Sequence, residues 1–132
     1  MRNVLIAIAV MLAACGGPMQ TLELVNQTPR PIEAFYVYPH GGDRGASRGS
    51  LAPDARTSVQ VKAGRIDVYA VSAKYQLDEH TRDRPEASQE LEVRGPARVI
   101  FYDADSKPAE VARPDVFGVE FSLPKPRGND GP

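Results

Sequence analysis

Apolar and polar residues alternate along most of the chain after residue 20, and this period of two restricts the possible folds more than any other feature. Successive side chains of a β-strand point to opposite faces, so the alternation predicts strands with one buried face. It recurs in five segments: 21–24, 58–62, 66–70, 90–94 and 117–123. Two further runs, 32–38 and 99–102, are apolar on both faces, which predicts central strands or strands covered on both sides.

Residues typical of turns separate these seven predicted strands, at 26–31, 53–54, 63–64 and 95–96. Short strands divided in this way predict an all-β fold, an antiparallel β-sandwich of about seven strands with an immunoglobulin-like or transthyretin-like topology. We expect one domain over residues 21–123. The polar residues 124–132 contain three prolines and two glycines, and we expect them to form a disordered tail.

The N-terminus has the order of charges and apolar residues found in a secretory signal peptide. Arg2 precedes an apolar run from Val4 to Leu12, and two small residues, Ala13 and Ala14, follow it. This run is shorter than the roughly 20 apolar residues that a membrane-spanning helix needs. We therefore predict a segment that directs export and is removed by cleavage.

Leu12-Ala13-Ala14-Cys15 resembles the lipobox of bacterial lipoprotein precursors. The resemblance implies that residues 1–14 are the signal peptide and that a lipid on Cys15 anchors the protein to a membrane. By the same resemblance, Gly16 after the cysteine implies the outer membrane, with the protein facing the periplasm. Residues 15–20 would then be a tether of at most about 20 Å, so partners must come to the domain.

Charge and cysteine content exclude some functions. Loss of Arg2 from the 16 basic residues leaves 15 against 17 acidic ones, so the mature chain has no basic field for nucleic acid. Cys15 is the only cysteine, and the predicted lipid occupies it. The domain must therefore fold without a disulfide, although export favours disulfide formation.

The predicted connection 39–54 is the first candidate binding element. It contains four glycines together with His40, Arg44 and Arg48, and loops of this length are often functional. Glycine-rich backbone and arginine side chains could hold a glycan or an anion. A mobile hairpin tip explains the same composition.

Gly45-Ala46-Ser47-Arg48-Gly49 matches the G-x-S-x-G pattern of serine hydrolases. That pattern needs a strand running into a helix, and no such βα unit is predicted. We therefore expect no catalytic residues, no cofactor and no enzymatic activity.

The connection 78–88 carries His80 among carboxylates, but one histidine without a second at ligand spacing is weak support for a metal site. We expect a solvated hairpin tip and no metal. Asp103 and Asp105 predict a turn after a strand, since they lack the rest of a calcium-binding loop. Asn26 and Thr28 predict a turn held by hydrogen bonds from side chains to the backbone.

Tyrosines recur on one side of the run 32–38. Tyr36 and Tyr38 share one side of this predicted strand, and Phe35 and Val37 share the other. A partly exposed tyrosine row would be a docking surface for protein or glycan. Packing in the core explains the same residues with no further assumption.

Residues 22–75 resemble a recurring, uncharacterised bacterial secreted domain. The resemblance rests on Leu24 to Thr28, on Phe35 to Pro39, on Gly49 to Pro53 and on Ile66 to Val71; the Trp-Gly-Asp stretch usual in that domain is missing. Size, lipobox and an Asn-containing turn are also similar to the small outer-membrane lipoprotein of type VI secretion, a transthyretin-like sandwich that docks an inner-membrane partner.

These observations together predict a lipid-anchored, non-enzymatic envelope protein that docks another envelope component. Strand addition at a sheet edge is one expected mechanism, because unpaired backbone groups there already form a template. The alternatives are capture of a glycan or anion by the 39–54 loop, and a role as a lipoprotein subunit of a type VI-like assembly.

Overall fold

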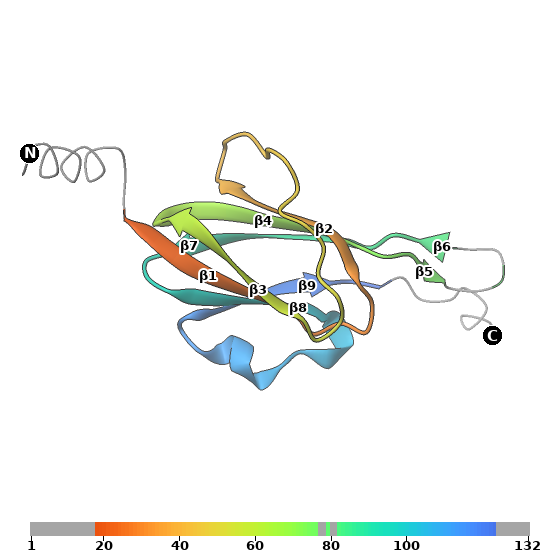
Figure 1. The fold of residues 1–132 in the computed structure, drawn as a ribbon. Coiled ribbons are helices and arrows are strands. Elements are labelled where there is room, and N and C mark those ends of the chain that lie inside the picture. The colour runs from red at the N-terminus through yellow and green to blue at the C-terminus, as the bar shows by residue number, and fades with distance from the viewer. Residues whose placement is uncertain (1–17, 77–78, 80–81, 124–132) are drawn as a thin grey trace, which may run out of the picture.

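The computed structural model describes residues 18–76, 79 and 82–123. Within them the chain forms two stacked β-sheets, with two short 3₁₀ turns on the outside (Figure 1). The predicted all-β sandwich is confirmed. Residues 1–14, Cys15 and residues 124–132, which carry the predicted signal peptide, lipid and tail, lie outside the described residues.

Nine strands make up the described fold: β1 (Met19–Asn26), β2 (Ile32–Pro39), β3 (Arg56–Lys62), β4 (Gly64–Ser72), β5 (Tyr75–Gln76), β6 (Arg82–Asp83), β7 (Glu86–Val93), β8 (Ala97–Asp103) and β9 (Val116–Phe121). One sheet has the order β3-β1-β8-β9 and the other the order β2-β4-β7. All seven predicted strands are present. The two-residue strands β5 and β6 were not predicted, and they form a hairpin of their own.

Two ladders run parallel, whereas the prediction was of antiparallel pairing throughout. β8 pairs in parallel with both β1 and β9. The connection from β8 to β9 passes through η1 (Ala104–Ser106) and η2 (Ala109–Ala112). It supplies the roughly dozen residues that a parallel return needs, so Val116 at the start of β9 pairs with Arg98 near the start of β8.

The core lies between the two sheets and contains the inward-facing members of the alternating pattern. Its largest fully buried side chains include Leu22, Leu24, Phe35, Phe101 and Phe121. Complete burial of one such side chain stabilises the fold by roughly 1.5–3 kcal/mol. The period of two in the sequence is thus the alternation between this core and the outer faces.

β8 is covered on both sides, as its apolar run predicted. Val99 and Phe101 face the main core, while Ile100 and Tyr102 form a second cluster with Val116 and the half-buried Val111 of η2. The connection that makes β9 parallel therefore also covers the outer face of its own sheet.

The same prediction was wrong for β2, which is the outer strand of its sheet and not a central one. Phe35 and Val37 are buried in the core, and Tyr36 and Tyr38 are half-buried on the outer face. Tyrosine tolerates such a position because its ring is apolar and its hydroxyl is polar. Aromatic residues on both faces of a strand do not by themselves show that both faces are covered.

No helix in the described part of the chain is long and apolar enough to span a bilayer.

Candidate functional site

The loop after β2 brings two of the three predicted binding residues onto the outer face of the β2-β4-β7 sheet. His40 follows β2 directly, and its backbone N–H donates to the carbonyl of Arg65 on β4 over 3.0 Å. The loop then rises away from the sheets (Figure 1). Arg44, inside this loop, returns its guanidinium to the sheet, 4.2 Å from the ring centre of Tyr69 and 5.5 Å from that of Tyr36.

Arg48, the third predicted residue, has a different role. Its backbone N–H donates to the carbonyl of Phe35 over 2.7 Å, and its guanidinium donates to the carbonyl of Val37 over 3.3 Å. Residues 48–51 thereby occupy the free edge of β2, where Leu51 also bridges to Ile32. A stretch predicted as loop is thus partly paired with the sheet.

Both arginines line a hollow of about 350 Å³ inside the loop, together with Asp43. Each guanidinium already has a protein partner. That of Arg44 lies over two aromatic rings, and that of Arg48 donates to a carbonyl. The Asp43 carboxylate in the same hollow opposes an anion. This geometry supports the predicted anion site only weakly. The outer face of the sheet gives stronger support to a docking surface.

We call Tyr36, Tyr38, Tyr69 and Arg44 the tyrosine face. Tyr36 and Tyr69 are paired residues on β2 and β4, and their ring centres are 5.6 Å apart. With Arg44 over both rings, they form a stack in which the ring faces attract the cation. The tyrosine row predicted on one side of this strand is therefore an outer surface, while Phe35 and Val37 pack in the core.

The Tyr69 hydroxyl donates a hydrogen bond to a Glu86 carboxylate oxygen on β7. This bond, together with partial burial of the ring, raises the pKa of Tyr69 above its ordinary value of 10.0. The nearby charge of Arg44 acts in the opposite direction on this pKa and offsets part of the increase.

A second group of polar side chains adjoins the tyrosine face. His40 Nδ1 lies 3.0 Å from Asp67 Oδ1 on β4 and 3.3 Å from Glu90 Oε1 on β7. Arg65 donates to the other Glu90 oxygen, from Nε over 3.0 Å and from a terminal nitrogen over 2.6 Å. The Glu90 carboxylate raises the pKa of Arg65 through this hydrogen bond and through its charge.

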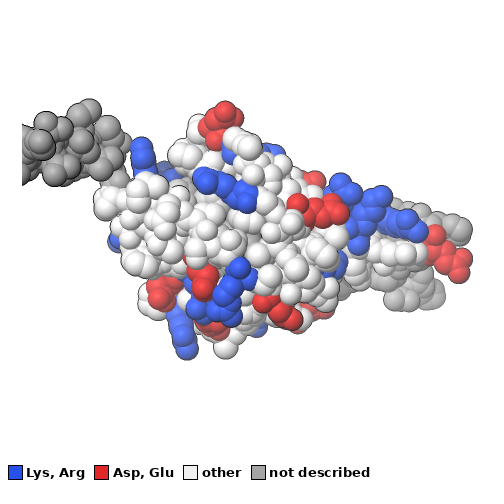
Figure 2. All heavy atoms as spheres, viewed as in Figure 1, with Lys and Arg blue, Asp and Glu red and all other residues white. Residues whose placement is uncertain are grey.

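The opposite outer face, on the β3-β1-β8-β9 sheet, is covered over β8 and β9 by residues of the η1-η2 connection. Arg98 donates to Glu23 over 2.7 Å and to Glu110 of η2, and these bonds raise its pKa. Val111 packs beside them on the β8-β9 pair. Figure 2 shows acidic and basic side chains in small mixed groups around a broad uncharged area.

The turn predicted at Asn26 and Thr28 is confirmed and is buried. The Asn26 side-chain amide donates to the carbonyls of Arg30 and Leu51 over 2.8 and 3.0 Å. Its oxygen accepts from the backbone and the hydroxyl of Thr28 over 2.9 and 2.8 Å. Asn26 thus joins the β1-β2 turn to the chain segment that precedes β3.

An ion pair that the sequence did not reveal lies beside this turn. Arg30 donates two hydrogen bonds to the Asp103 carboxylate over 2.9 and 2.7 Å and a third to the Ser72 hydroxyl over 2.9 Å. Both charged side chains are nine-tenths buried. Because Ser72 ends β4 and Asp103 ends β8, the group joins the two sheets at one end of the sandwich and has a structural role.

The remaining predicted positions add little to a site. The Ser47 hydroxyl donates to the carbonyl of Gly49 and accepts from its backbone N–H, as in a local turn. In the predicted 78–88 connection, β6 and the start of β7 replace part of the loop. Asp78 and His80 lie outside the described residues.

Comparison of the chain with models of known protein families gave no match, and comparisons with curated proteins and with solved structures gave none either. The site must therefore be interpreted from its own geometry.

Sequence reasoning selected His40 and Arg44 and left the face of Tyr69 open, but it missed Asp67 and Glu90. Tyr69, Asp67 and Glu90 occupy alternate, outward positions on β4 and β7, where polar residues are expected on any half-buried strand. Only the strand register would have revealed this group, because it places Asp67 opposite both Tyr38 and Glu90. Register is a tertiary property that this sequence does not display.

Proposed function

We propose that this protein is a lipid-anchored, non-enzymatic docking module of the bacterial cell envelope, which binds another envelope protein through the tyrosine face. The observation that carries the proposal is the stack of Arg44 on Tyr36 and Tyr69. Tyrosine and arginine are enriched in protein interfaces and among the residues that dominate their binding energy. Of the two outer faces in the described fold, this one is not covered by the η1-η2 connection.

The charges beside the tyrosine face indicate what kind of partner fits. β7 is the outer strand of its sheet and presents Glu86, Glu90 and Glu92 in alternate outward positions. Arg65 of β4 balances one of these carboxylates. A partner with basic side chains around an apolar or aromatic centre would complement this arrangement.

Docking on the face is favoured over strand addition at an edge. Residues 48–51 already pair with the free edge of β2. β7, at the other edge of that sheet, carries a row of glutamates, and charged side chains on an edge strand discourage pairing with another chain. Both edges of this sheet are therefore poor templates.

Anchoring through Cys15 would place the domain close to a membrane. β1 begins at Met19, two residues before the predicted domain boundary, and Gly16, Gly17 and Pro18 separate it from Cys15. The four steps from Cys15 to Met19 span at most roughly 14 Å when extended. A partner must therefore reach the domain near the bilayer surface.

The proposal can be tested by crosslinking in cells. A photoreactive amino acid placed at Ser88, which is exposed on the outer face of β7, should give one discrete protein adduct. The same amino acid at Ser58, exposed on β3 of the other sheet, is the positional control. Equal adducts from both positions would contradict the proposal.

Substitutions define the contribution of the face. Arg44→Ala should weaken the Ser88 adduct by roughly fivefold or more, as loss of an interface anchor does. Arg56→Ala is the matched control, because Arg56 is an exposed arginine of β3 with only a 3.9 Å ion pair to Glu23. Cys15→Ala should release the protein from membranes and abolish the adduct. An unchanged adduct in Arg44→Ala would exclude this docking face.

A further variant, Arg48→Ala, separates docking from ligand capture by the 39–54 loop. Arg44 and Arg48 both line the hollow in that loop. If Arg48→Ala removed binding of a glycan or anion and left the Ser88 adduct intact, capture would be the better description.

A further inference from the structure

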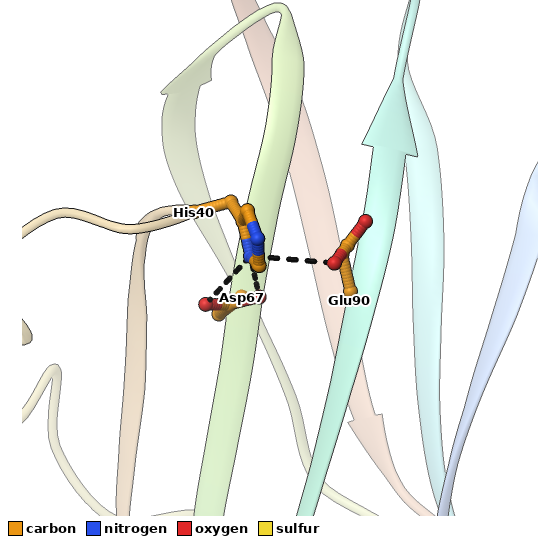
Figure 3. A group of neighbouring side chains, drawn as sticks. All are labelled: His40, Asp67 and Glu90. Atoms are coloured by element: carbon orange, nitrogen blue, oxygen red, sulfur yellow. Dashed lines mark hydrogen bonds and ion pairs between the residues drawn. The ribbon is translucent and has the colours of Figure 1, made fainter.

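Three adjacent strands bring one imidazole and two carboxylates together on the outer face of the sheet. His40 follows β2, Asp67 lies on β4 and Glu90 lies on β7, and Figure 3 shows the three side chains pointing toward one another. One potential ligand atom from each lies within 4.8 Å of the others. These residues are 27 and 23 positions apart in the sequence, so only the sheet makes them neighbours.

The backbone holds the group in this arrangement. Asp67 pairs directly with Glu90 in the β4-β7 register. His40 is tied to β4 by the hydrogen bond from its backbone N–H to the Arg65 carbonyl. Like charges directly opposite each other on neighbouring strands are destabilising unless a cation lies between them. The register therefore creates a local requirement for positive charge.

The separations match those between ligands of one metal ion. His40 Nδ1 is 3.0 and 3.2 Å from the two Asp67 oxygens and 3.3 Å from Glu90 Oε1. Nitrogen and oxygen ligands about 2.1 Å from a tetrahedral zinc ion are roughly 3.4 Å apart. Small side-chain movements would therefore convert the ion-paired group into a coordination shell.

The surroundings also suit a metal site. Arg65 binds Glu90 Oε2, which orients the carboxylate and leaves Oε1 directed at His40. Metal-binding carboxylates usually accept a hydrogen bond of this kind from a neighbouring side chain, which fixes their orientation. A hollow of about 310 Å³, lined by Tyr38, Asp67 and Glu90 among others, adjoins the group. A fourth ligand, such as water, could enter from this side.

We propose that His40, Asp67 and Glu90 bind a divalent transition-metal ion of the zinc class, with one coordination position open to the outer face. An imidazole nitrogen together with carboxylates suits zinc, whereas calcium prefers six to eight oxygen ligands. In the absence of metal, the imidazole donates to the carboxylates instead. This proposal departs from the expectation of no metal that the sequence suggested, and it is independent of the proposed docking partner.

The test is a calorimetric titration of the full chain with Zn²⁺, without a histidine tag and with Cys15→Ala to remove its only thiol. One ion should bind per chain. His40→Ala should weaken the affinity for Zn²⁺ by more than about tenfold. Asp67→Asn and Glu90→Gln keep the shape of the side chain, and each should weaken the affinity by at least about tenfold. His80→Ala is the matched control, because His80 is the only other histidine, and it should leave the affinity unchanged.

Two further measurements make the result decisive. The visible spectrum of bound Co²⁺ should show a nitrogen and oxygen ligand set that is lost in His40→Ala, and circular dichroism should show that this variant remains folded. Absence of saturable Zn²⁺ binding, equal affinity in His40→Ala, or loss of affinity in His80→Ala would overturn the proposal. Stoichiometric Ca²⁺ binding in place of Zn²⁺ would overturn the assigned metal class.

Discussion

Arg30 and Asp103 show how single residues hold the two sheets together. Burying two charges is costly, and their attraction offsets this cost only when the geometry is good and the other polar atoms are satisfied. Here the pairing is bidentate, and the Arg30 Nε also donates to Ser72. Arg30 further lies 5.8 Å from the ring centres of Tyr75 and Phe121, which cover it.

Asp103→Asn should lower the free energy of unfolding by about 3–5 kcal/mol, because it leaves the Arg30 charge buried without its counter-ion. Denaturant unfolding followed by circular dichroism measures the change. Glu110→Gln is the control, since Glu110 pairs with the more exposed Arg98, and its effect should stay below about 1 kcal/mol. Similar losses in the two variants would argue against a buried, uncompensated charge.

At the scale of elements, the β8-β9 pair depends on a residue without a side chain. A Cβ at Gly118 would lie 2.7 Å from Tyr102 Cε1 and 2.9 Å from Val111 Cγ1. Glycine here lets the Tyr102 ring and η2 pack closely over the outer face of β9. This contact covers the β8-β9 part of the face opposite the candidate site.

Gly118→Ala should destabilise the fold by roughly 1–3 kcal/mol, because the added methyl group overpacks this contact. Gly95→Ala is the matched control, since a Cβ there meets nothing within 4 Å and the residue has no positive φ. Thermal unfolding of both variants tests the difference. The interpretation fails if Gly118→Ala is as stable as Gly95→Ala.

At the scale of the whole molecule, the sandwich has two unlike outer faces. The β3-β1-β8-β9 sheet is covered by Val111 and by the Arg98 ion pairs. The β2-β4-β7 sheet exposes tyrosines and the His40 group. The asymmetry arises because the long parallel connection η1-η2 folds back over one sheet only (Figure 1).

Raised tyrosine pKa values on these two faces predict a loss of stability at alkaline pH. The hydrogen bond to Glu86 and partial burial raise the pKa of Tyr69. Burial, and to a smaller extent the charge of Glu120, raises the pKa of Tyr102. The folded state therefore holds these protons to higher pH than the unfolded state, whose tyrosines have the ordinary pKa of 10.0. This contribution to stability is fully present below about pH 10 and is lost as pH rises through the folded-state values.

Glu86→Gln should lower the pKa of Tyr69 toward its ordinary value and reduce the alkaline loss of unfolding free energy. Phenolate absorbance during a pH titration reports the pKa, and denaturant unfolding across the alkaline range reports the stability. Tyr69→Phe identifies the transition that belongs to this residue. An unchanged Tyr69 transition in Glu86→Gln would rule out the proposed cause.

Local patterns in the sequence predicted much of the fold and little of the candidate site. Alternation located five of the seven longer strands, because a half-buried strand needs an apolar residue at every second position whatever its neighbours are, and continuous apolar runs located the other two. The Asn26 turn was also predictable, since its side chain bonds within four residues of itself to Thr28 and Arg30. His40 and Arg44 were selected only as members of an unusual loop.

Strand order and register were decided by the tertiary structure alone. Parallel pairing of β8 with β1 and β9 and the edge position of β2 depend on how apolar faces pack across the whole chain. The group of His40, Asp67 and Glu90 and the pair of Arg30 and Asp103 follow from that packing, the latter across 73 residues. By itself the sequence determined which residues are buried in the strands that alternate, because burial there follows a local period of two. It did not determine which outward residues meet, because that is set by long-range pairing between strands.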